Sequence, residues 1–326
     1  MLTRKRKLLA LGLALPLALV ACTSSGSKGT SSSSSGSGGA GKYGFKIAVV
    51  THGAVGDTFW DVVKKGALQA GKDEGDNVTY QSDGDPQKQS QLIDAAVNEK
   101  VDGLVVSMAN PDALKGSIEK AVQAGIPVIT INSGQDKSAE FGALAHVGQD
   151  ETIAGEGAGE KMKAEGVTKA ICVIQEAGNV GLEQRCAGFK QGLGGDVQNV
   201  QVQNSDPTGA QSIIKAKLAA DKSINGVLTL GPVIGKAALG AVQGNSVKLA
   251  TFDLNADVTK AIADGQMLFA VDQQQYVQGY LPIVMLTLYK ANLNTIGGGH
   301  PVLTGPGFVT KDNASQVQQL AAAGTR

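Results

Sequence analysis

The sequence predicts an α/β protein with two doubly wound lobes, each built on a parallel sheet. After residue 45, short runs of apolar and β-branched residues alternate with longer stretches of helical period. Such alternation is typical of parallel sheets that are covered on both faces by helices. Residues 101–121 also resemble residues 224–242, and each of these segments is followed by a second strand. A repeat of half a chain favours two similar lobes over a solenoid, whose repeats are roughly 20–50 residues long.

The individual elements follow from the same pattern. Strands are expected at 45–51, 102–108, 126–132, 169–175, 225–231, 247–253 and 267–273, with weaker ones at 77–81 and 199–203. Helices are expected at 59–71, 86–99, 113–124, 151–164, 207–220 and 256–264. Right-handed crossovers join parallel strands of this kind. A ligand is then expected where the carboxyl ends of the strands of the two lobes face each other.

The first 22 residues predict export and lipid attachment. Residues 4–7 are basic, residues 8–20 are apolar but too short to span a membrane, and L-V-A-C ends at Cys22. This order is typical of a lipoprotein signal peptide. We therefore expect residues 1–22 to be the signal, Cys22 to be acylated, and the protein to be extracytoplasmic and anchored to the cell membrane. An ordinary signal peptide with an incidental cysteine is the alternative.

Residues 23–42 and the net charge of the chain narrow the class of protein further. Residues 23–42 are mostly Ser and Gly, which offer no apolar surface to bury, so we expect a disordered tether. The chain has 29 basic and 29 acidic residues and a net charge of zero. This balance gives no electrostatic footprint for nucleic acid. The roughly 280 residues that follow the tether suffice for two domains of ordinary size.

Five segments carry a resemblance to a known family. They are D-T-F-W-D-V-V-K-K-G (57–66), A-G-I-P-V-I-T-I-N (124–132), N-V-G-L-E-Q-R-C-A-G-F (179–189), K-L-A-T-F-D (248–253) and F-A-V-D-Q (269–273). In this order and spacing, over about residues 45 to 310, the chain resembles type I periplasmic binding proteins of the ribose-binding branch. These are the solute-binding components of carbohydrate ABC importers.

The resemblance implies an organisation that the periodicity alone does not give. The chain would cross between the lobes three times, through a three-strand hinge. The N-terminal lobe would comprise residues 43–146 and 274–301, and the C-terminal lobe residues 147–273 and 302–326. Ligand would close the lobes by a hinge motion, and a membrane permease would recognise the closed form. A monomer is expected.

The resemblance assigns ligand contacts in the first lobe. Asp57, Phe59 and Trp60 follow the first strand, and the aromatic rings would pack against the C–H faces of a sugar. Core packing of the rings and helix capping by Asp57 are the structural alternatives. Asn132 stands where ribose binders use an aspartate, and Ser133 where they use an arginine. Because an amide both donates and accepts, this departure argues against ribose itself.

The resemblance also assigns contacts in the second lobe. Arg185, Asp253 and Gln273 match ligand residues of the family. A cation near the start of a helix is unfavourable for the helix dipole, which indicates that Arg185 has another task. The alternatives are a surface salt bridge of Arg185 with Glu183 or a neighbour, and a turn role for Asp253.

Other polar residues on strand-end loops are candidates as well. Gly231 replaces an amide contact of the family, so a further contact is expected from Asn110, Asn179 or Glu176. His52 follows the first strand and is a weaker candidate for the cleft wall. The three histidines of the chain are scattered, so neither a metal site nor a cofactor is expected.

Two structural features are expected near the second-lobe site. Cys172 lies in a predicted strand and Cys186 in the following helix, which can bring the two within disulfide range in an exported protein. Two small buried hydrophobic residues are the alternative. The run G-E-G-A-G (155–159) lies in a helical segment, where small residues would let the helix pack closely.

Binding is a better hypothesis than catalysis. The sequence has no G-x-S-x-G motif, no Ser/His/Asp set on strand ends and no metal-ligand cluster. We expect a protein without catalytic residues that captures a small neutral sugar or sugar alcohol and delivers it to an ABC permease. A sugar sensor for signalling or chemotaxis is one alternative, and an exported enzyme is another. The departures at 132, 133 and 231 favour a polyol or an unusual pentose over ribose.

Overall fold

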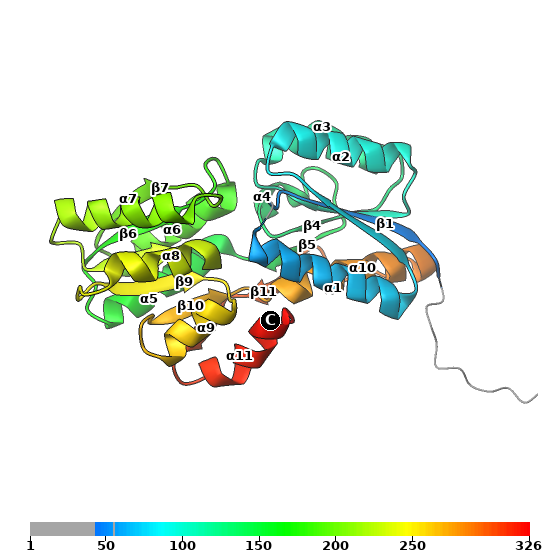
Figure 1. The fold of residues 1–326 in the computed structure, drawn as a ribbon. Helices are drawn as coiled ribbons and strands as arrows, with labels where there is room; N and C mark the ends of the chain where they lie inside the picture. The colour runs from blue at the N-terminus through cyan, green and yellow to red at the C-terminus, as the bar shows by residue number, and fades with distance from the viewer. Residues whose placement is uncertain (1–42, 55) are drawn as a thin grey trace, which may run out of the picture. The chain divides into compact units, whose positions relative to one another are not determined.

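The computed structural model describes residues 43–54 and 56–326. They form two lobes, each with a six-stranded sheet between helices (Figure 1). The predicted signal peptide, Cys22 and the Ser/Gly tether lie outside the described residues. None of the helices in the described part of the chain is both long enough and apolar enough to cross a bilayer. The two-lobed α/β architecture with parallel sheets confirms the predicted fold class.

The first lobe has a wholly parallel sheet in the order β11-β5-β4-β3-β1-β2. Its strands are β1 (Lys46–Thr51), β2 (Asn77–Ser82), β3 (Gly103–Ser107), β4 (Val128–Ile131), β5 (Ala145–Gln149) and β11 (Val302–Gly305). Its helices are α1 (Thr58–Glu74), α2 (Pro86–Asn98), α3 (Pro111–Gln123), the short α4 (Gln135–Ser138) and α10 (Gln275–Asn292). Figure 1 shows α2 and α3 on one face of the sheet and α1 and α10 on the other.

Alternating side chains of the strands pack into the two helical layers of this lobe. In β1, Ala48 and Val50 point toward the cluster that includes α2 and α3. Ile47 and Val49 belong to the cluster that includes α1 and α10. Because both faces are covered, the strand reads as a continuous apolar run rather than an alternating one.

The second lobe repeats this arrangement, with the order β12-β10-β9-β8-β6-β7. Its strands are β6 (Lys169–Ile174), β7 (Asp196–Gln201), β8 (Gly226–Thr229), β9 (Lys248–Phe252), β10 (Phe269–Asp272) and β12 (Gly307–Thr310). Its helices are α5 (Glu151–Ala164), α6 (Val180–Leu193), α7 (Pro207–Ala220), α8 (Pro232–Val242), α9 (Ala256–Ala263) and α11 (Ala314–Ala323). Only β12 runs antiparallel to its neighbour, β10.

The chain passes between the sheets three times, and the sheets shift two of the expected lobe boundaries. β5 stays in the first sheet as far as Gln149, beyond the expected boundary at residue 146. β11 pairs with β5 of the first sheet, so the last passage follows Gly305 rather than residue 301. The physical reason is that β5 and β11 extend the hydrogen-bonded ladder of the first sheet through segments that have no continuous apolar run. All three passages leave from strands at the same edge of each sheet.

Close helix packing in the second lobe explains the glycine-rich run. A Cβ atom on Gly155 would collide with the backbone of Arg185, and one on Gly159 with the backbone of Phe189. Gly188 and Gly192 of α6 approach the backbone of α5 in the same way. The small residues therefore let α5 and α6 touch along their backbones, which confirms the packing role predicted for residues 155–159.

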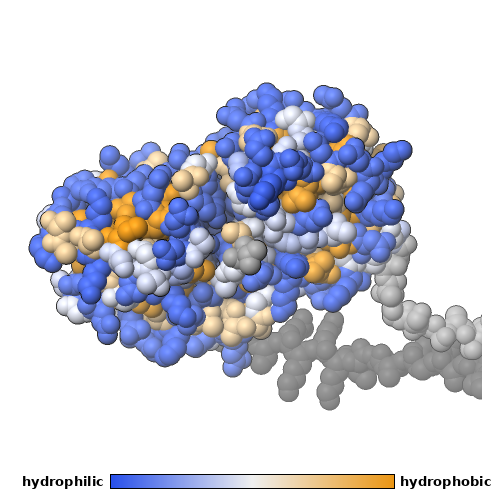
Figure 2. All heavy atoms as spheres, turned by 45° about the horizontal axis from the view of Figure 1, so that its top comes forward, coloured by the Kyte–Doolittle hydropathy of each residue, from blue (hydrophilic) through white to orange (hydrophobic). Residues whose placement is uncertain are grey.

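The surface view indicates where apolar side chains remain outside. Figure 2 shows hydrophilic residues over most of this face, with hydrophobic residues in separate patches. Single exposed apolar side chains are normal on a soluble surface and require no partner.

Candidate functional site

A small cavity lies between the lobes, at the carboxyl ends of the strands. Seven of the eight predicted ligand residues line it: Asp57, Phe59, Trp60, Asn132, Arg185, Asp253 and Gln273. The remaining lining residues are His52, Gln175, Glu176, Asn179, Leu182, Asn204, Leu230, Gly231 and Pro232. Asn110 is the exception. It lines a neighbouring cavity, and its side chain caps α3 by accepting from the N–H of Ala113, because Asn110 directly precedes the first turn.

The cavity has a volume of about 30 Å³. Such a space holds roughly two water molecules. A monosaccharide is several times larger, so binding one requires the lobes to separate or the side chains to move. Several direct contacts keep the lobes together here, including the hydrogen bond from Gln184 Nε2 to Asp136 Oδ2 at 2.8 Å. Asn204 Nδ2 donates to Asp57 Oδ2 at 3.0 Å, Ser133 Oγ donates to Asn179 Oδ1 at 3.0 Å, and the N–H of Val180 donates to the carbonyl of Ala109 at 3.0 Å.

Asp57 combines helix capping with a place in the cavity wall. Its Oδ1 accepts from the N–H of Phe59 at 3.0 Å at the start of α1, and its Oδ2 accepts from Asn204 of the other lobe. Burial, reinforced by the negative charge of Glu176, raises the pKa of Asp57 to about 7. The carboxyl group is therefore much easier to protonate than an exposed aspartate.

The aromatic residues form a tight group under the cavity. Trp60 meets Phe59 edge-to-face at 4.9 Å between ring centroids and His52 at 4.6 Å. Phe59 and Trp60 belong to the core cluster of the first lobe and also line the cavity, so each ring has both roles. A Cβ on Gly53 would lie 2.5 Å from Trp60 Cγ, which explains why glycine precedes this group.

His52 is a neutral member of the wall. Its Nδ1 lies 2.7 Å from Ser107 Oγ, and its Nε2 lies 3.4 Å from Asn179 Nδ2 and 3.7 Å from Glu176 Oε2. Burial, with a smaller contribution from the charge of Arg185, lowers the pKa of His52 to about 3. The ring is therefore uncharged at neutral pH and offers one donor and one acceptor.

Three residues form a hydrogen-bonded chain across the hinge side of the cavity. Asn132 Nδ2 donates to Gln273 Oε1 at 3.0 Å, and Gln273 Nε2 donates to Asp253 Oδ1 at 2.8 Å. Asn132 follows β4 with φ +61°, and Asp253 follows β9 with φ +66°. Asn and Asp tolerate this left-handed region better than most residues. The backbone thus turns both side chains into the cavity.

Arg185 is held by a carboxylate that the sequence did not single out. Its Nε lies 2.6 Å from Glu151 Oε2 and its Nη2 2.8 Å from Glu151 Oε1, a bidentate pair of two buried side chains. Its Nη1 donates to the carbonyl of Leu230 at 3.3 Å and lies 3.8 Å from Asp253 Oδ2. Its guanidinium also lies over the ring of Phe252 at 4.6 Å. Glu151, rather than Glu183, is therefore the ionic partner of Arg185.

The cavity holds more carboxyl groups than cations. Among the described lining residues, Asp57, Glu176 and Asp253 face one arginine whose charge is already matched by Glu151. Burial raises the pKa of Asp253 to about 8 although Arg185 opposes this shift, and burial also raises the pKa of Glu176. Carboxyl groups in this state accept hydrogen bonds from hydroxyls when ionised and donate one when protonated.

Gln175 occupies the space that Gly231 leaves. A Cβ on Gly231 would lie 2.8 Å from Gln175 Nε2. This amide donates to the carbonyl of Leu230 at 3.3 Å, and its Oε1 is buried without a hydrogen-bond partner. The departure at 231 is therefore matched by an amide that reaches the cavity from the neighbouring strand.

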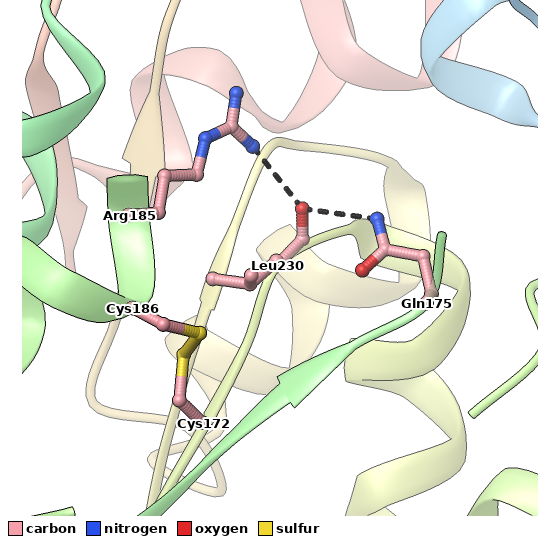
Figure 3. Close-up of a disulfide and its surroundings, with 5 residues drawn as sticks. All are labelled: Cys172, Gln175, Arg185, Cys186 and Leu230. Carbon is pink, nitrogen blue, oxygen red and sulfur yellow. Dashed lines mark hydrogen bonds between the residues drawn. A yellow bond between two sulfur atoms is a disulfide. The ribbon is translucent and has the colours of Figure 1, made fainter. Parts of the chain in front are cut away.

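A disulfide joins β6 to α6 below these residues. The sulfurs of Cys172 and Cys186 lie 2.00 Å apart, and the Cα atoms are 5.8 Å apart. Figure 3 shows the bridge next to Arg185 and Gln175, whose side chains both reach the carbonyl of Leu230.

The arrangement can bind a molecule that both donates and accepts hydrogen bonds over most of its surface. Amides, carboxyls and a guanidinium surround the cavity, and aromatic rings form one wall. Within the described residues, no group of three or more His, Cys, Asp or Glu side chains is placed to hold a metal ion.

Comparisons with known proteins extend this description. The family of the periplasmic binding protein domain matches residues 47–292. A carbohydrate transporter from Acidothermus cellulolyticus, solved with myo-inositol, has 45% sequence identity and a TM-score of 0.85, and covers 87% of this chain and 100% of its own. An ABC transporter solute-binding protein from Agrobacterium vitis, solved with D-fucose, has 27% identity and a TM-score of 0.76 over 85% of this chain and 99% of its own.

A curated relative is more distant. The xylose/arabinose-binding protein of Sulfolobus acidocaldarius is 23% identical over 242 residues, which is 68% of this chain. The match spans 60% of that relative's length.

Proposed function

Because the chain belongs to the periplasmic binding protein family, we propose that it captures a small neutral sugar or sugar alcohol between its lobes and delivers it to an ABC importer. The observation that carries this proposal is the interlobe cavity, in which polar groups from both lobes converge beside an aromatic wall. A polyhydroxylated molecule can satisfy such buried groups from several directions. A ligand that lacks a hydroxyl would leave one of them unpaired, which supplies selectivity.

We propose a cyclic polyol, with myo-inositol as the first candidate. The neighbour at 45% identity was solved with myo-inositol. A ring with a hydroxyl on every carbon can donate to Asp57, Glu176 and Asp253 and accept from the amides of Asn132 and Gln273. The amide at 132 supports this choice over ribose, because it both donates and accepts where a carboxylate only accepts.

A ligand panel tests the proposal. We expect myo-inositol to bind more tightly than D-ribose, D-arabinose, D-fucose and glycerol in calorimetric titrations. Trp60 is the only tryptophan and lines the cavity, so its fluorescence should change on binding. If no member of the panel produces heat, a fluorescence change or a rise in melting temperature, the proposed function is wrong.

The proposal includes the absence of turnover and an attachment to the membrane. Proton NMR of myo-inositol after long incubation with the protein should show the ligand unchanged, and a new species would indicate an enzyme. The lipid anchor rests on Cys22, which follows a basic and apolar leader. Labelled palmitate should enter the full chain in its host and not the Cys22→Ala variant. Cells that lack the ABC permease that receives the ligand should fail to accumulate it.

A further inference from the structure

The disulfide closes a loop, residues 172–186, that contributes much of the second lobe's part of the cavity wall. Cys172 and Cys186 are 14 residues apart. Between them lie five lining residues of the interlobe cavity: Gln175, Glu176, Asn179, Leu182 and Arg185. The first lobe has no corresponding crosslink, since Cys172 and Cys186 are the two cysteines of the described residues.

The two ends of the bridge adjoin two polar contacts. Cys186 directly follows Arg185 on α6, and Cys172 precedes Gln175 by three residues at the end of β6. The side chains of Arg185 and Gln175 both donate to the carbonyl of Leu230, at 3.3 Å each (Figure 3). The bridge therefore fixes the register of the helix on the strand at the point where both side chains enter the cavity.

The remaining contacts of this loop leave its position less constrained. Arg185 is held by Glu151 of α5, but Gln175 Oε1 is buried and unpaired, and Glu176 is only partly buried. Asn179 bonds to Glu176 within the same loop. The further bonds of this loop, from Ser133 to Asn179 and from Val180 to Ala109, reach the first lobe, so they do not hold the loop when the lobes are apart. Without a covalent link, ordering these side chains around a ligand would cost conformational entropy at each binding event.

We propose that the Cys172–Cys186 disulfide positions Arg185 and Gln175 for ligand binding, so that the loop is ordered once, on folding, rather than at each binding event. This inference rests on the proposed function of the same cavity. It differs from general stabilisation, in which a disulfide acts on the unfolded chain and leaves the folded site unchanged. The exposed fraction is 0% for Cys172 and 2% for Cys186, so the bridge is a permanent brace out of reach of external thiols.

The test compares affinity with stability. Two variants remove the bridge: Cys172→Ala/Cys186→Ala, and Cys172→Val/Cys186→Ala, which keeps more of the buried volume if the first folds poorly. Each is titrated with myo-inositol, or with the tightest ligand of the panel, at a temperature where circular dichroism shows it folded. We expect the Kd to rise about tenfold, the scale on which ordering a flexible side chain weakens binding.

A matched control separates positioning from loss of stability. Leu218→Ala removes a buried side chain of α7 in the other core cluster of the same lobe. It should lower the melting temperature while the Kd stays within about twofold, because variants that remain folded bind through an unchanged site. An equal rise of the Kd in Leu218→Ala would overturn the positioning role.

A double-mutant cycle gives a readout that a purely structural bridge would not move. Arg185→Lys should weaken binding strongly in the bridged protein and less in the bridge-free variants, since the arginine is no longer held in place there. Equal effects of Arg185→Lys in both backgrounds, with a normal Kd in the bridge-free variants, would overturn the inference. Failure of the unaltered protein to bind any panel member would instead overturn the proposed function.

Discussion

The two lobes share one strand order but provide different chemistry to the cavity. The first lobe contributes mainly aromatic and neutral polar groups, and Asp57 is its one carboxyl group at the cavity. The second lobe contributes the guanidinium of Arg185 and the carboxyl groups of Glu176 and Asp253. The shared strand order thus places side chains at equivalent strand ends in the two lobes. The residues at these positions differ, so one lobe presents aromatic rings and the other presents ionisable groups.

Asn132 and Asp253 show this most directly. Each directly follows the corresponding strand of its sheet, each has a positive φ, and each bonds to Gln273. The backbone conformation is therefore common to the two lobes, whereas the side chain is neutral in one and acidic in the other.

The lobes also differ in how their inner helices are braced. α5 and α6 approach through Gly155, Gly159, Gly188 and Gly192, and the disulfide ties α6 to its strand. α1 and α10 of the first lobe approach through Gly66 and Gly279. The second lobe, which contributes Arg185, thus has more close helix contacts and the disulfide.

The largest single effect should come from the charged lobe. Arg185→Ala leaves the buried carboxylate of Glu151 unpaired and should lower the free energy of unfolding by about 3–5 kcal/mol. Chemical denaturation measures the loss. The double variant Arg185→Met/Glu151→Gln, which removes both charges, should lose less. If the double variant loses as much as Arg185→Ala, the unpaired charge is not the cause.

Removing the two equivalent side chains sharpens the comparison of the lobes. Asp253→Gly and Asn132→Gly both keep the positive φ free of strain. Above the raised pKa of Asp253, at about pH 9, we expect Asp253→Gly to weaken binding by about 1.5–3 kcal/mol, as for hydrogen bonds to charged groups, and Asn132→Gly by about 0.5–1.5 kcal/mol. Calorimetric titration with the best panel ligand measures both. Equal losses would show that the charge difference between the lobes does not reach the ligand.

Substitution of the contact glycines between α5 and α6, and between α1 and α10, should lower stability by similar amounts in the two lobes. A Cβ on Gly188 would collide with the backbone of Thr152, and one on Gly66 with the backbone of Tyr276. Gly188→Ala and Gly66→Ala should each cost about 1–3 kcal/mol by overpacking. Gly116→Ala in α3 is the control, since its Cβ meets open space, and should stabilise by about 0.4–1 kcal/mol. Unaltered melting temperatures for Gly188→Ala and Gly66→Ala would contradict the close backbone contact between the paired helices.

The smallest effect should be a pH dependence of stability. The pKa of Asp253 is raised to about 8 and that of Asp57 to about 7 in the folded protein, in both cases mainly by burial. The folded state then binds more protons than the unfolded state, so its stability falls as pH rises toward those values. The lowered pKa values of His52 (about 3) and His146 (about 4) act in the opposite sense, but only below their ordinary value of 6.5.

The window above pH 6.5 therefore isolates the carboxyl groups. The melting temperature should decline from about pH 6.5 to about pH 8.5, and Asp253→Asn should flatten the decline more than Asp57→Asn. A melting temperature that rises over this range in the unaltered protein would contradict the raised pKa values.

The sequence predicted the fold where its apolar runs were long and buried on both faces. The helices at 151–164 and 207–220 are found with the expected bounds. β5, β11 and β12 were missed because they are short edge or near-edge strands whose sequences lack a continuous apolar run; β11 and β12 are also only partly buried. The place of β11 depends on pairing with β5, which lies far back in the chain, and the place of β12 on pairing with β10 across an intervening helix; a local pattern contains neither.

The family resemblance assigned candidate residues at the ends of the apolar strands. Asp253 and Asn132 were assigned in this way and both line the cavity, and their role in ligand binding stays a prediction. Glu151 escaped because it follows β5, which the pattern did not reveal, and because its partner Arg185 lies on another helix. Asn204 escaped because its role arises from the approach of the two lobes, where it bonds to Asp57.

The three passages lie toward one edge of each sheet, and this position predicts the order in which the contacts between the lobes break and form. Rotation about that edge moves each atom in proportion to its distance from it. Gln273 lies within one of the passages, so its bonds to Asn132 and Asp253 change little as the lobes separate. The contact between Asp57 and Asn204 lies toward the opposite edge, so we expect it to break first. In the proposed capture, the ligand would meet Asn132, Gln273 and Asp253 early, and the Asp57–Asn204 bond would re-form as the last step.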